Sequence, residues 1–149
     1  MDPARLFDLS GKLALVTGGS SGIGEMAAEG LVRAGARVLI TSRRGEACAA
    51  VAERLNALGA SGEAEGFAGD VGSEDGVAAL AGEVRKRAGR LDILFNNAGR
   101  SWGARLDDFP YDAWDKVMRL NVAGLFELTR ALLPELRAAA REDDPARVV

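Results

Sequence analysis

The sequence contains no histidine and only one cysteine, Cys48. Without histidine, the Ser-His-Asp and Cys-His arrangements of many hydrolases are excluded, and so is a structural zinc site of the usual cysteine and histidine type. A single cysteine cannot form a disulfide within the chain. Because Cys48 stands among alanines in a stretch with helical spacing, we interpret it as a small helix residue and not as a reactive thiol.

Long apolar runs and a strong charge of one sign are also missing. No apolar stretch is long enough to span a bilayer, and the first eight residues lack the apolar centre of a secretory signal. The net charge is -3, and the 19 lysines and arginines are spread along the chain, without a basic stripe. We therefore expect neither a nucleic-acid partner nor a membrane partner, and a cytoplasmic location.

The residues that are present fit one α/β domain over 1–149. Hydrophobic residues make up 48% and charged residues 28%, an ordinary globular balance. Short apolar runs alternate with segments of helical spacing. Strands are predicted over 12–17, 36–41, 63–68, 91–95 and, at the chain end, 146–149. Helices are predicted over 22–34, 46–58, about 73–89 and 111–140, the last with a kink at Pro134. This alternation predicts a Rossmann-like, doubly wound parallel sheet, truncated in the fifth strand.

A glycine-rich segment, Thr17-Gly18-Gly19-Ser20-Ser21-Gly22-Ile23-Gly24, joins the first predicted strand to the first helix. Glycines let a backbone turn tightly and approach a pyrophosphate closely. The helix N-terminus then offers free N–H groups and a positive dipole end to phosphates. The glycines alone are also compatible with a simple turn. Because strand, loop and helix come in the required order, we interpret the segment as a nucleotide-binding loop.

The end of the second predicted strand indicates which nucleotide is bound. Sites for NAD usually place an acidic residue there, on the ribose 2′-hydroxyl. This chain has Ser42, followed by Arg43 and Arg44. A guanidinium pairs well with a phosphate, whereas a carboxylate would repel it. The pattern predicts NADP(H), with Arg43 as the better candidate for the 2′-phosphate, whereas Arg44 fits a solvated surface charge equally well.

Four motifs, in this order, resemble the short-chain dehydrogenase/reductase family. They are the Gly-x-x-x-Gly-x-Gly spacing after Thr17, Asp70-Val71 after the third predicted strand, Asn96-Asn97-Ala98-Gly99 after the fourth, and Asn121 within Leu120–Gly124. The resemblance covers essentially the whole chain. It implies cofactor-binding roles for Gly18, Ser20, Ser21, Gly22, Ile23, Gly24, Ser42, Arg43, Asp70, Val71, Asn97, Ala98 and Gly99.

Several of these residues also have a plainer interpretation. Asp70 matches the family residue that contacts the adenine amino group, but it also suits a turn or a cap. The two asparagines, Asn96 and Asn97, are either simple loop residues or braces of the sheet that help line the cofactor cleft. The family's NADP-binding members often carry a basic residue at the position of Ser21. Because this chain has serine there, its site must rely more heavily on Arg43.

The family resemblance also implies catalytic residues that this chain does not contain. Asn121 matches the asparagine of the family's catalytic tetrad, which shapes a helix kink and helps to hold a water. The tetrad serine follows the fifth strand, and Tyr-x-x-x-Lys lies on the next helix, whereas this chain ends at Val149. The only tyrosine, Tyr111, is followed by Lys116 at the wrong spacing. We expect a structural role for Asn121 here and an inactive chain.

We expect the complete gene product to be an NADP(H)-dependent oxidoreductase that reduces a small-molecule carbonyl to an alcohol. The alternatives are a non-catalytic NADP(H)-binding module and a non-functional truncated product. Residues 96–104 and 114–118 are similar to bacterial 3-oxoacyl-thioester reductases of the rhamnolipid-synthesis type, although sugar, polyol and steroid reductases share the same front half. Trp102 either lines the substrate mouth or packs the loop.

The resemblance also implies assembly into a homo-oligomer, a dimer or tetramer, when the protein is complete. The last predicted helix would contribute an apolar face, which in the family packs at a subunit interface. Its members are Val117, Leu125, Leu128, Leu132 and Leu136. We expect the isolated chain to expose apolar surface and to aggregate readily.

Overall fold

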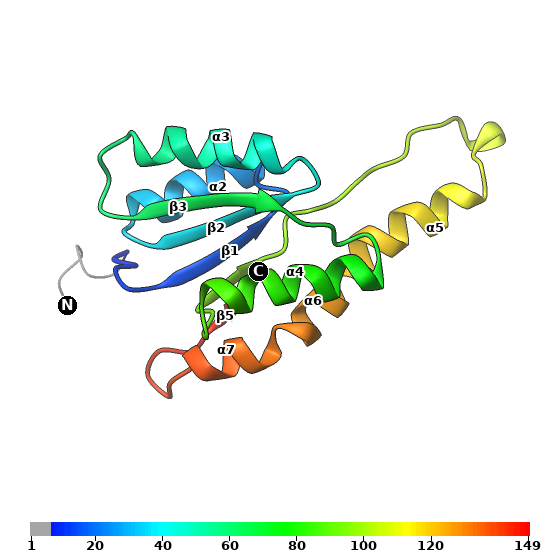
Figure 1. The fold of residues 1–149 in the computed structure, drawn as a ribbon. Helices are drawn as coiled ribbons and strands as arrows, with labels where there is room; N and C mark the ends of the chain where they lie inside the picture. The colour runs from blue at the N-terminus through cyan, green and yellow to red at the C-terminus, as the bar shows by residue number, and fades with distance from the viewer. Residues whose placement is uncertain (1–6) are drawn as a thin grey trace.

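A computed structural model describes residues 7–149 as a parallel sheet with helices on both faces (Figure 1). Residues 1–6, part of the segment in which no secretory signal was expected, lie outside the described residues. The strands are β1 (Leu13–Thr17), β2 (Arg37–Ser42), β3 (Glu63–Ala68), β4 (Ile93–Phe95) and β5 (Arg147–Val148). Their order, β3-β2-β1-β4-β5, and their parallel pairing confirm the predicted doubly wound sheet.

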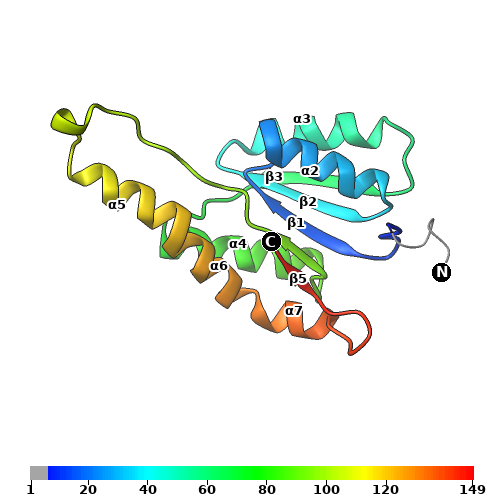
Figure 2. The ribbon, with the colours of Figure 1, turned by 180° about the vertical axis from the view of Figure 1, so that it is seen from behind.

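The helices divide between the two faces of the sheet (Figures 1 and 2). One face carries α2 (Gly22–Arg33) and α3 (Gly45–Asn56), and the other carries α4 (Glu74–Arg87), α6 (Leu125–Ala131) and α7 (Leu133–Ala139). Successive residues of β1 and β2 alternate between the two resulting cores, and both sets are buried. Two-sided burial explains why these strands read as continuous apolar runs in the sequence.

Glycine and serine end and begin helices where the sequence predicted. Gly35 and Gly59 follow α2 and α3 with φ of +96° and +66°, the left-handed backbone that favours glycine after a helix. Ser73 caps α4, because its Oγ accepts a hydrogen bond from the Gly76 N–H at 3.1 Å.

The charged strand β3 lies at the sheet edge, as expected for a segment containing Glu63 and Glu65. Arg37 of β2 makes ion pairs with both carboxylates, at 3.3 and 3.4 Å. Arg87 of α4 pairs with Glu65 at 2.6 Å and covers the Phe67 ring at 4.1 Å. The edge charges therefore also tie β3 to its neighbouring strand and to α4.

The predicted helix over 111–140 is divided in the structure. It consists of α5 (Asp112–Met118), a π-helical turn η2 (Arg119–Gly124), α6 and α7. The break before α7 falls at Leu132, with φ -96° and ψ 6°, and Pro134 occupies the first turn of α7. Proline is tolerated there but clashes with a preceding helical turn, so the predicted kink is confirmed. The π-helical turn was not predicted, because apolar spacing does not signal it.

The apolar face predicted for this region is open only in part: Leu125 is 40% exposed and Val117 is half-buried, whereas the other three members are covered. Leu128, Leu132 and Leu136 are buried in the core shared with α4, because that helix packs directly on them. The large apolar side chains that are exposed along this segment are Tyr111, Trp114, Met118, Val122, Leu125, Phe126 and Leu133. We call these seven residues the apolar stripe. Within residues 7–149, no helix has the length and apolar character to cross a membrane.

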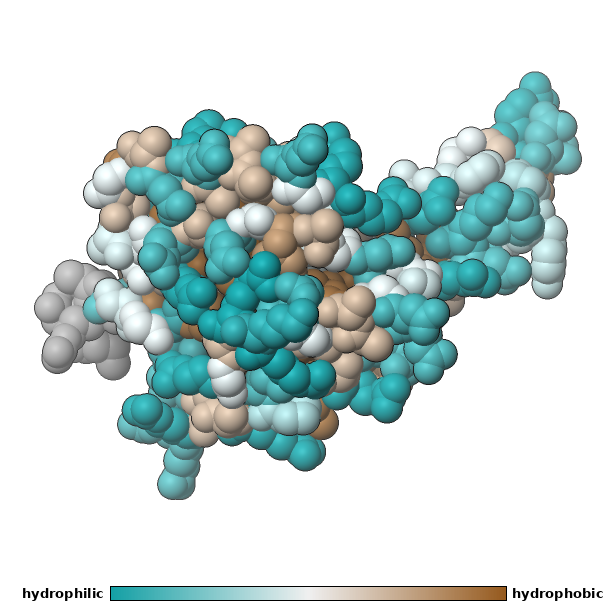
Figure 3. Space-filling view, in the orientation of Figure 1, coloured by the Kyte–Doolittle hydropathy of each residue, from teal (hydrophilic) through white to brown (hydrophobic). Residues whose placement is uncertain are grey.

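The loop after β4, together with a 3₁₀ turn η1 (Leu106–Asp108) and α5, forms an arm that projects away from the sheet (Figures 1 and 2). The face of the arm shown in Figure 3 is mostly hydrophilic, whereas the body shows apolar patches between its polar groups. The arm departs from the sheet at the carboxyl ends of the strands, which places it beside the site described below.

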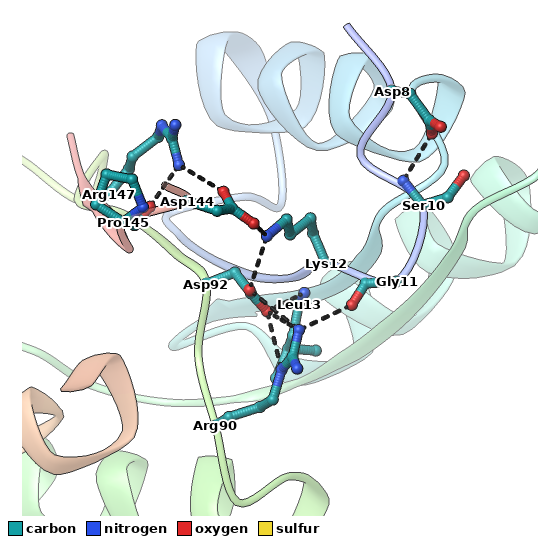
Figure 4. A network of polar contacts seen from close by, with 10 residues as sticks. All are labelled: Asp8, Ser10, Gly11, Lys12, Leu13, Arg90, Asp92, Asp144, Pro145 and Arg147. Carbon is teal, nitrogen blue, oxygen red and sulfur yellow. Dashed lines mark hydrogen bonds and ion pairs between the residues drawn. The ribbon is translucent and has the colours of Figure 1, made fainter. Parts of the chain in front are cut away.

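A buried aspartate organises the opposite end of the sheet (Figure 4). Asp92 is 4% exposed and accepts hydrogen bonds from the Leu13 N–H, the Lys12 ammonium and the Arg90 guanidinium, at 3.0, 3.4 and 3.1 Å. Lys12 also pairs with Asp144, in the segment that leads into β5. The segment β5 pairs with Ile93 and Leu94 along the outer edge of β4.

Candidate functional site

A cleft of about 700 Å³ lies at the carboxyl ends of the strands. Its walls are the segments that follow β1, β2, β3 and β4, together with residues of α5 and the start of η2. Ligands of doubly wound sheets bind outside the carboxyl ends of the strands, where the strand order reverses. Here β1 lies between β2 and β4, so the cleft occupies that point.

The glycine-rich loop forms one wall through backbone that only glycine adopts readily. Gly18 and Gly22 have φ of +66° and +60°. Ser21 precedes α2 in extended conformation, and its side chain makes no capping hydrogen bond. The first N–H groups of α2 therefore have no side-chain cap, which leaves them suited to an anion.

Hydrogen bonds join this loop to the segment after β4. Thr17 is 2% exposed, and its Oγ1 accepts from the N–H groups of Asn97 and Ala98 at 3.1 and 3.0 Å. The Asn97 side-chain amide donates to the carbonyls of Thr17 and Gly18 at 3.1 and 3.2 Å. A Cβ at Gly24 would overlap that amide, which explains the third glycine. Asn97 therefore braces the site, and the role of Thr17 as its acceptor was missed from sequence.

The end of β2 supplies cationic groups to the cleft. Ser42, Arg43 and Arg44 all line it. Among residues 7–149, neither arginine makes an ion pair with a carboxylate, in contrast to Arg37 and Arg87 on the neighbouring edge. Two unneutralised guanidinium groups at one wall favour an anionic ligand there.

The segment after β3 supplies Asp70 and Val71, which also line the cleft. Asp70 Oδ1 accepts from the Gly72 N–H at 2.9 Å, so this residue does shape a turn, and its carboxylate still lies at the cleft. Thr41 is 1% exposed, lines the same wall, and its hydroxyl has no hydrogen-bond partner within the described residues. Nothing in the sequence pattern distinguishes Thr41 from other strand residues.

Asn121 does not line the cleft but fixes one of its walls. Its Oδ1 accepts from the Arg100 N–H and its Nδ2 donates to the Arg100 carbonyl, both at 2.9 Å. This two-bond contact attaches the loop after β4 to η2. It agrees with the structural role expected for Asn121 in this chain.

The arm bears charged groups around one aromatic ring. Trp102 is 39% exposed, with the Lys116 ammonium 5.0 Å and the Arg100 guanidinium 6.0 Å from its ring centroid. Lys116 donates to Asp112 at 2.5 Å, and this hydrogen bond lowers the pKa of the Asp112 carboxyl below its usual value. Trp102 therefore lies between one cation of its own loop and one of α5, and it does not line the cleft.

The structure brings most of the predicted site residues to one cleft. Those that line it are Gly18, Ser20, Ser21, Ser42, Arg43, Asp70, Val71, Asn97, Ala98 and Gly99. Gly22 and Gly24 instead shape the start of α2, and Ile23 is 72% exposed outside the cleft lining. Within residues 7–149, no group of histidine, cysteine or acidic side chains is arranged to hold a metal ion.

The sequence matches a protein family and curated relatives. Residues 12–149 match the family model described as short chain dehydrogenase. The chain is 50% identical over 143 residues to the rhamnolipids biosynthesis 3-oxoacyl-[acyl-carrier-protein] reductase of Pseudomonas aeruginosa, covering 96% of this chain and 55% of that protein.

The chain is also similar to solved structures of reductases. The Pseudomonas aeruginosa RhlG/NADP active-site complex matches with a TM-score of 0.90 and 51% identity, over 99% of this chain and 56% of that one. A 3-oxoacyl (acyl-carrier-protein) reductase from Agrobacterium tumefaciens with NADP bound matches with a TM-score of 0.84 and 30% identity, over 99% and 55%. The chain spans about half the length of the curated relatives it matches.

Proposed function

Because the chain belongs to the short chain dehydrogenase family, we propose that it forms the NADP(H)-binding part of an oxidoreductase that reduces a carbonyl to an alcohol. The observation that carries the proposal is the cleft itself. A glycine loop before α2, the Asn97 segment and two arginines that pair with no carboxylate of residues 7–149 meet at the carboxyl ends of four parallel strands.

The residues present suit this cofactor. Gly18 and the uncapped start of α2 are suited to the pyrophosphate, Asp70 to the adenine amino group, and Arg43 to the 2′-phosphate. When bound, NADPH supplies the hydride for carbonyl reduction. The chain's own residues hold the nucleotide in place, and the Thr17–Asn97 hydrogen bonds keep the two loops around it in register.

A direct test is to titrate the full gene product that carries this chain with NADPH and with NADH. NADPH should bind more tightly, and Arg43→Ala should weaken NADPH binding about tenfold or more, because a charge-assisted hydrogen bond contributes about 1.5–3 kcal/mol. NADH binding should change little, since it lacks the 2′-phosphate. Equal affinity for the two nucleotides in the unmodified protein would contradict the assignment.

The first substrates to assay are 3-oxoacyl thioesters. This choice is supported by the names of two relatives, both 3-oxoacyl-[acyl-carrier-protein] reductases. The 149-residue chain on its own should show no NADPH-dependent ketone reduction, because it contains no Tyr-x-x-x-Lys. A gene product that binds NADPH but reduces no carbonyl compound would indicate a non-catalytic binding module instead.

We also propose that the complete protein is a homo-oligomer. The support is the apolar stripe along α5, η2, α6 and α7, where Trp114 and Phe126 are 59% and 61% exposed. Large apolar side chains are costly to leave in water. Phe126→Glu should shift the protein toward monomer in sedimentation experiments, and an unchanged oligomeric state would exclude this surface as the interface.

A further inference from the structure

The strand β5 is short and lies at the sheet edge, so burial contributes little to its register. It consists of Arg147 and Val148, which are both exposed, although Ala146 just before it packs against the core. Backbone hydrogen bonds of 2.7 to 2.9 Å join its ends to the segment around β4. Because the register of a strand is strongly specified only where one face is buried, β5 needs a further constraint.

Ion pairs at the amino end of β5 supply that constraint (Figure 4). The Lys12 ammonium, just before β1, contacts the carboxylates of Asp92 and Asp144. Asp92 directly precedes β4, and Asp144 lies in the turn before β5, where it also pairs with the Arg147 guanidinium at 3.4 Å. One lysine therefore joins the amino ends of three neighbouring strands. We call Lys12, Asp92 and Asp144 the latch.

The two carboxylates of the latch differ in how many partners they have. Asp92, whose side chain is 5% exposed, also accepts hydrogen bonds from the Arg90 guanidinium and from a backbone N–H of β1. Among the described residues, the Asp144 carboxylate contacts only Lys12 and Arg147. Removing the charge of Asp144 should therefore release β5 and leave the buried junction of β1 and β4 in place.

The opposite end of β5 reaches the candidate cofactor cleft. The Val149 carbonyl accepts from the Asn96 N–H at 2.7 Å, and the next residue, Asn97, lines the cleft and braces the glycine loop. The carboxyl ends of parallel strands lie at one edge of the sheet, where ligands of doubly wound folds bind. A segment that follows β5 therefore starts beside the cleft. A shift of one residue in β5 would displace it by about 3.3 Å and turn its side chains to the other face.

We propose that Asp144 is a positioning residue: through Lys12 it fixes the register of β5, and with it the point at which the segment after Val149 enters the site. The inference rests on the proposed function, because carbonyl reduction needs a proton donor and the 149-residue chain contains no Tyr-x-x-x-Lys. No residue of the latch lines the cleft, which lies at the other end of the strands. Loss of the latch should therefore affect the rate of reduction more than the binding of NADPH.

The test compares variants of the full gene product in NADPH-dependent carbonyl reduction, starting with a 3-oxobutyryl thioester. Asp144→Asn should lower kcat about threefold to tenfold and change the NADPH dissociation constant less than about twofold, because small displacements of a reacting group slow the reaction strongly. Asp144→Glu keeps the charge and should restore most of the rate. Asp143→Asn is the matched control: it removes an exposed carboxylate of the same turn that makes no ion pair with the described residues, and it should change neither quantity.

Two further measurements separate the latch from a general loss of structure. In Asp144→Asn, the N–H groups of Asn96 and Val149 should exchange hydrogen faster, whereas the buried N–H groups of β1 should not. Lys12→Met added to Asp144→Asn should lower kcat little further, because both substitutions break the same ion pair.

Three results would count against these ideas. An unchanged kcat in Asp144→Asn, or a loss of NADPH affinity as large as the loss of kcat, would overturn the proposal. Unchanged hydrogen exchange at Asn96 and Val149 in this variant would overturn it as well, whether or not the protein is active. An unmodified gene product that reduces no carbonyl compound would instead defeat the proposed function itself.

Discussion

Replacing Thr17 by valine tests whether hydrogen bonds between two loops hold the cofactor cleft together. Valine keeps the shape of threonine but removes the oxygen that accepts from the Asn97 and Ala98 N–H groups at 3.1 and 3.0 Å. The Asn97 N–H retains a second acceptor, the Phe95 carbonyl at 3.0 Å, whereas no other acceptor for the Ala98 N–H is found among the described residues. Most of the destabilisation should therefore come from the Ala98 N–H, which is left without an acceptor.

The size of the effect follows from these contacts. The substitution removes two hydrogen bonds, of about 0.5–1.5 kcal/mol each, and the Asn97 N–H keeps its second acceptor whereas the partly buried Ala98 N–H is left with none. We therefore expect the free energy of unfolding to fall by about 1–3 kcal/mol. Because Asn97, Ala98 and Gly99 all line the cleft, the affinity for NADPH should fall together with the stability, by about tenfold.

Thr17→Ser is the control, because it keeps the hydroxyl and loses a buried methyl group, at a cost of about 1 kcal/mol. Denaturant unfolding gives the stabilities, and fluorescence titration with NADPH gives the affinities. Serine should preserve NADPH binding and valine should not, although both destabilise the fold. If the valine variant binds NADPH as tightly as the serine variant, the hydrogen bonds do not organise the cleft and the reasoning is refuted.

Other parts of the fold can be tested in the same unfolding experiments. Gly30→Ala in α2 and Gly82→Ala in α4 add a methyl group in open space within a helix, and each should raise the free energy of unfolding by about 0.5–1 kcal/mol; a lowered denaturation midpoint would contradict this. Asp92→Ala leaves the buried Leu13 N–H without its acceptor and should cost about 2–3 kcal/mol, so a loss below about 1 kcal/mol would show that the network is dispensable. The hydrogen bond from Lys12 lowers the pKa of Asp144 below its ordinary value. The stability from this pair should therefore be present above about pH 4 and be lost as the pH falls through the folded-state pKa; Asp144→Asn should flatten that acid dependence, and an unchanged slope would argue against it.

Much of the fold follows from local pattern. Each strand and the first three helices lie within about two residues of where apolar spacing placed them, because both faces of the sheet are buried and the glycines after α2 and α3 mark their ends. The region 111–140 departs from prediction for two reasons. A π-helical turn has no signature in the spacing, and a stripe of leucines does not reveal whether a neighbouring helix covers it.

The same division holds for the site. The order of glycines, the serine at the end of β2 and the asparagine motif are local features, and they indicate a nucleotide loop and a family from the sequence alone. Contacts between segments far apart in sequence cannot be read from such local features. That Thr17 accepts from Asn97 and that Arg44 reaches Ser20 depends on which strands lie side by side. The sequence by itself determined the elements and the chemistry they carry. Only the tertiary structure decided which leucines are covered and which arginine crosses the cleft, because both depend on the packing of whole layers.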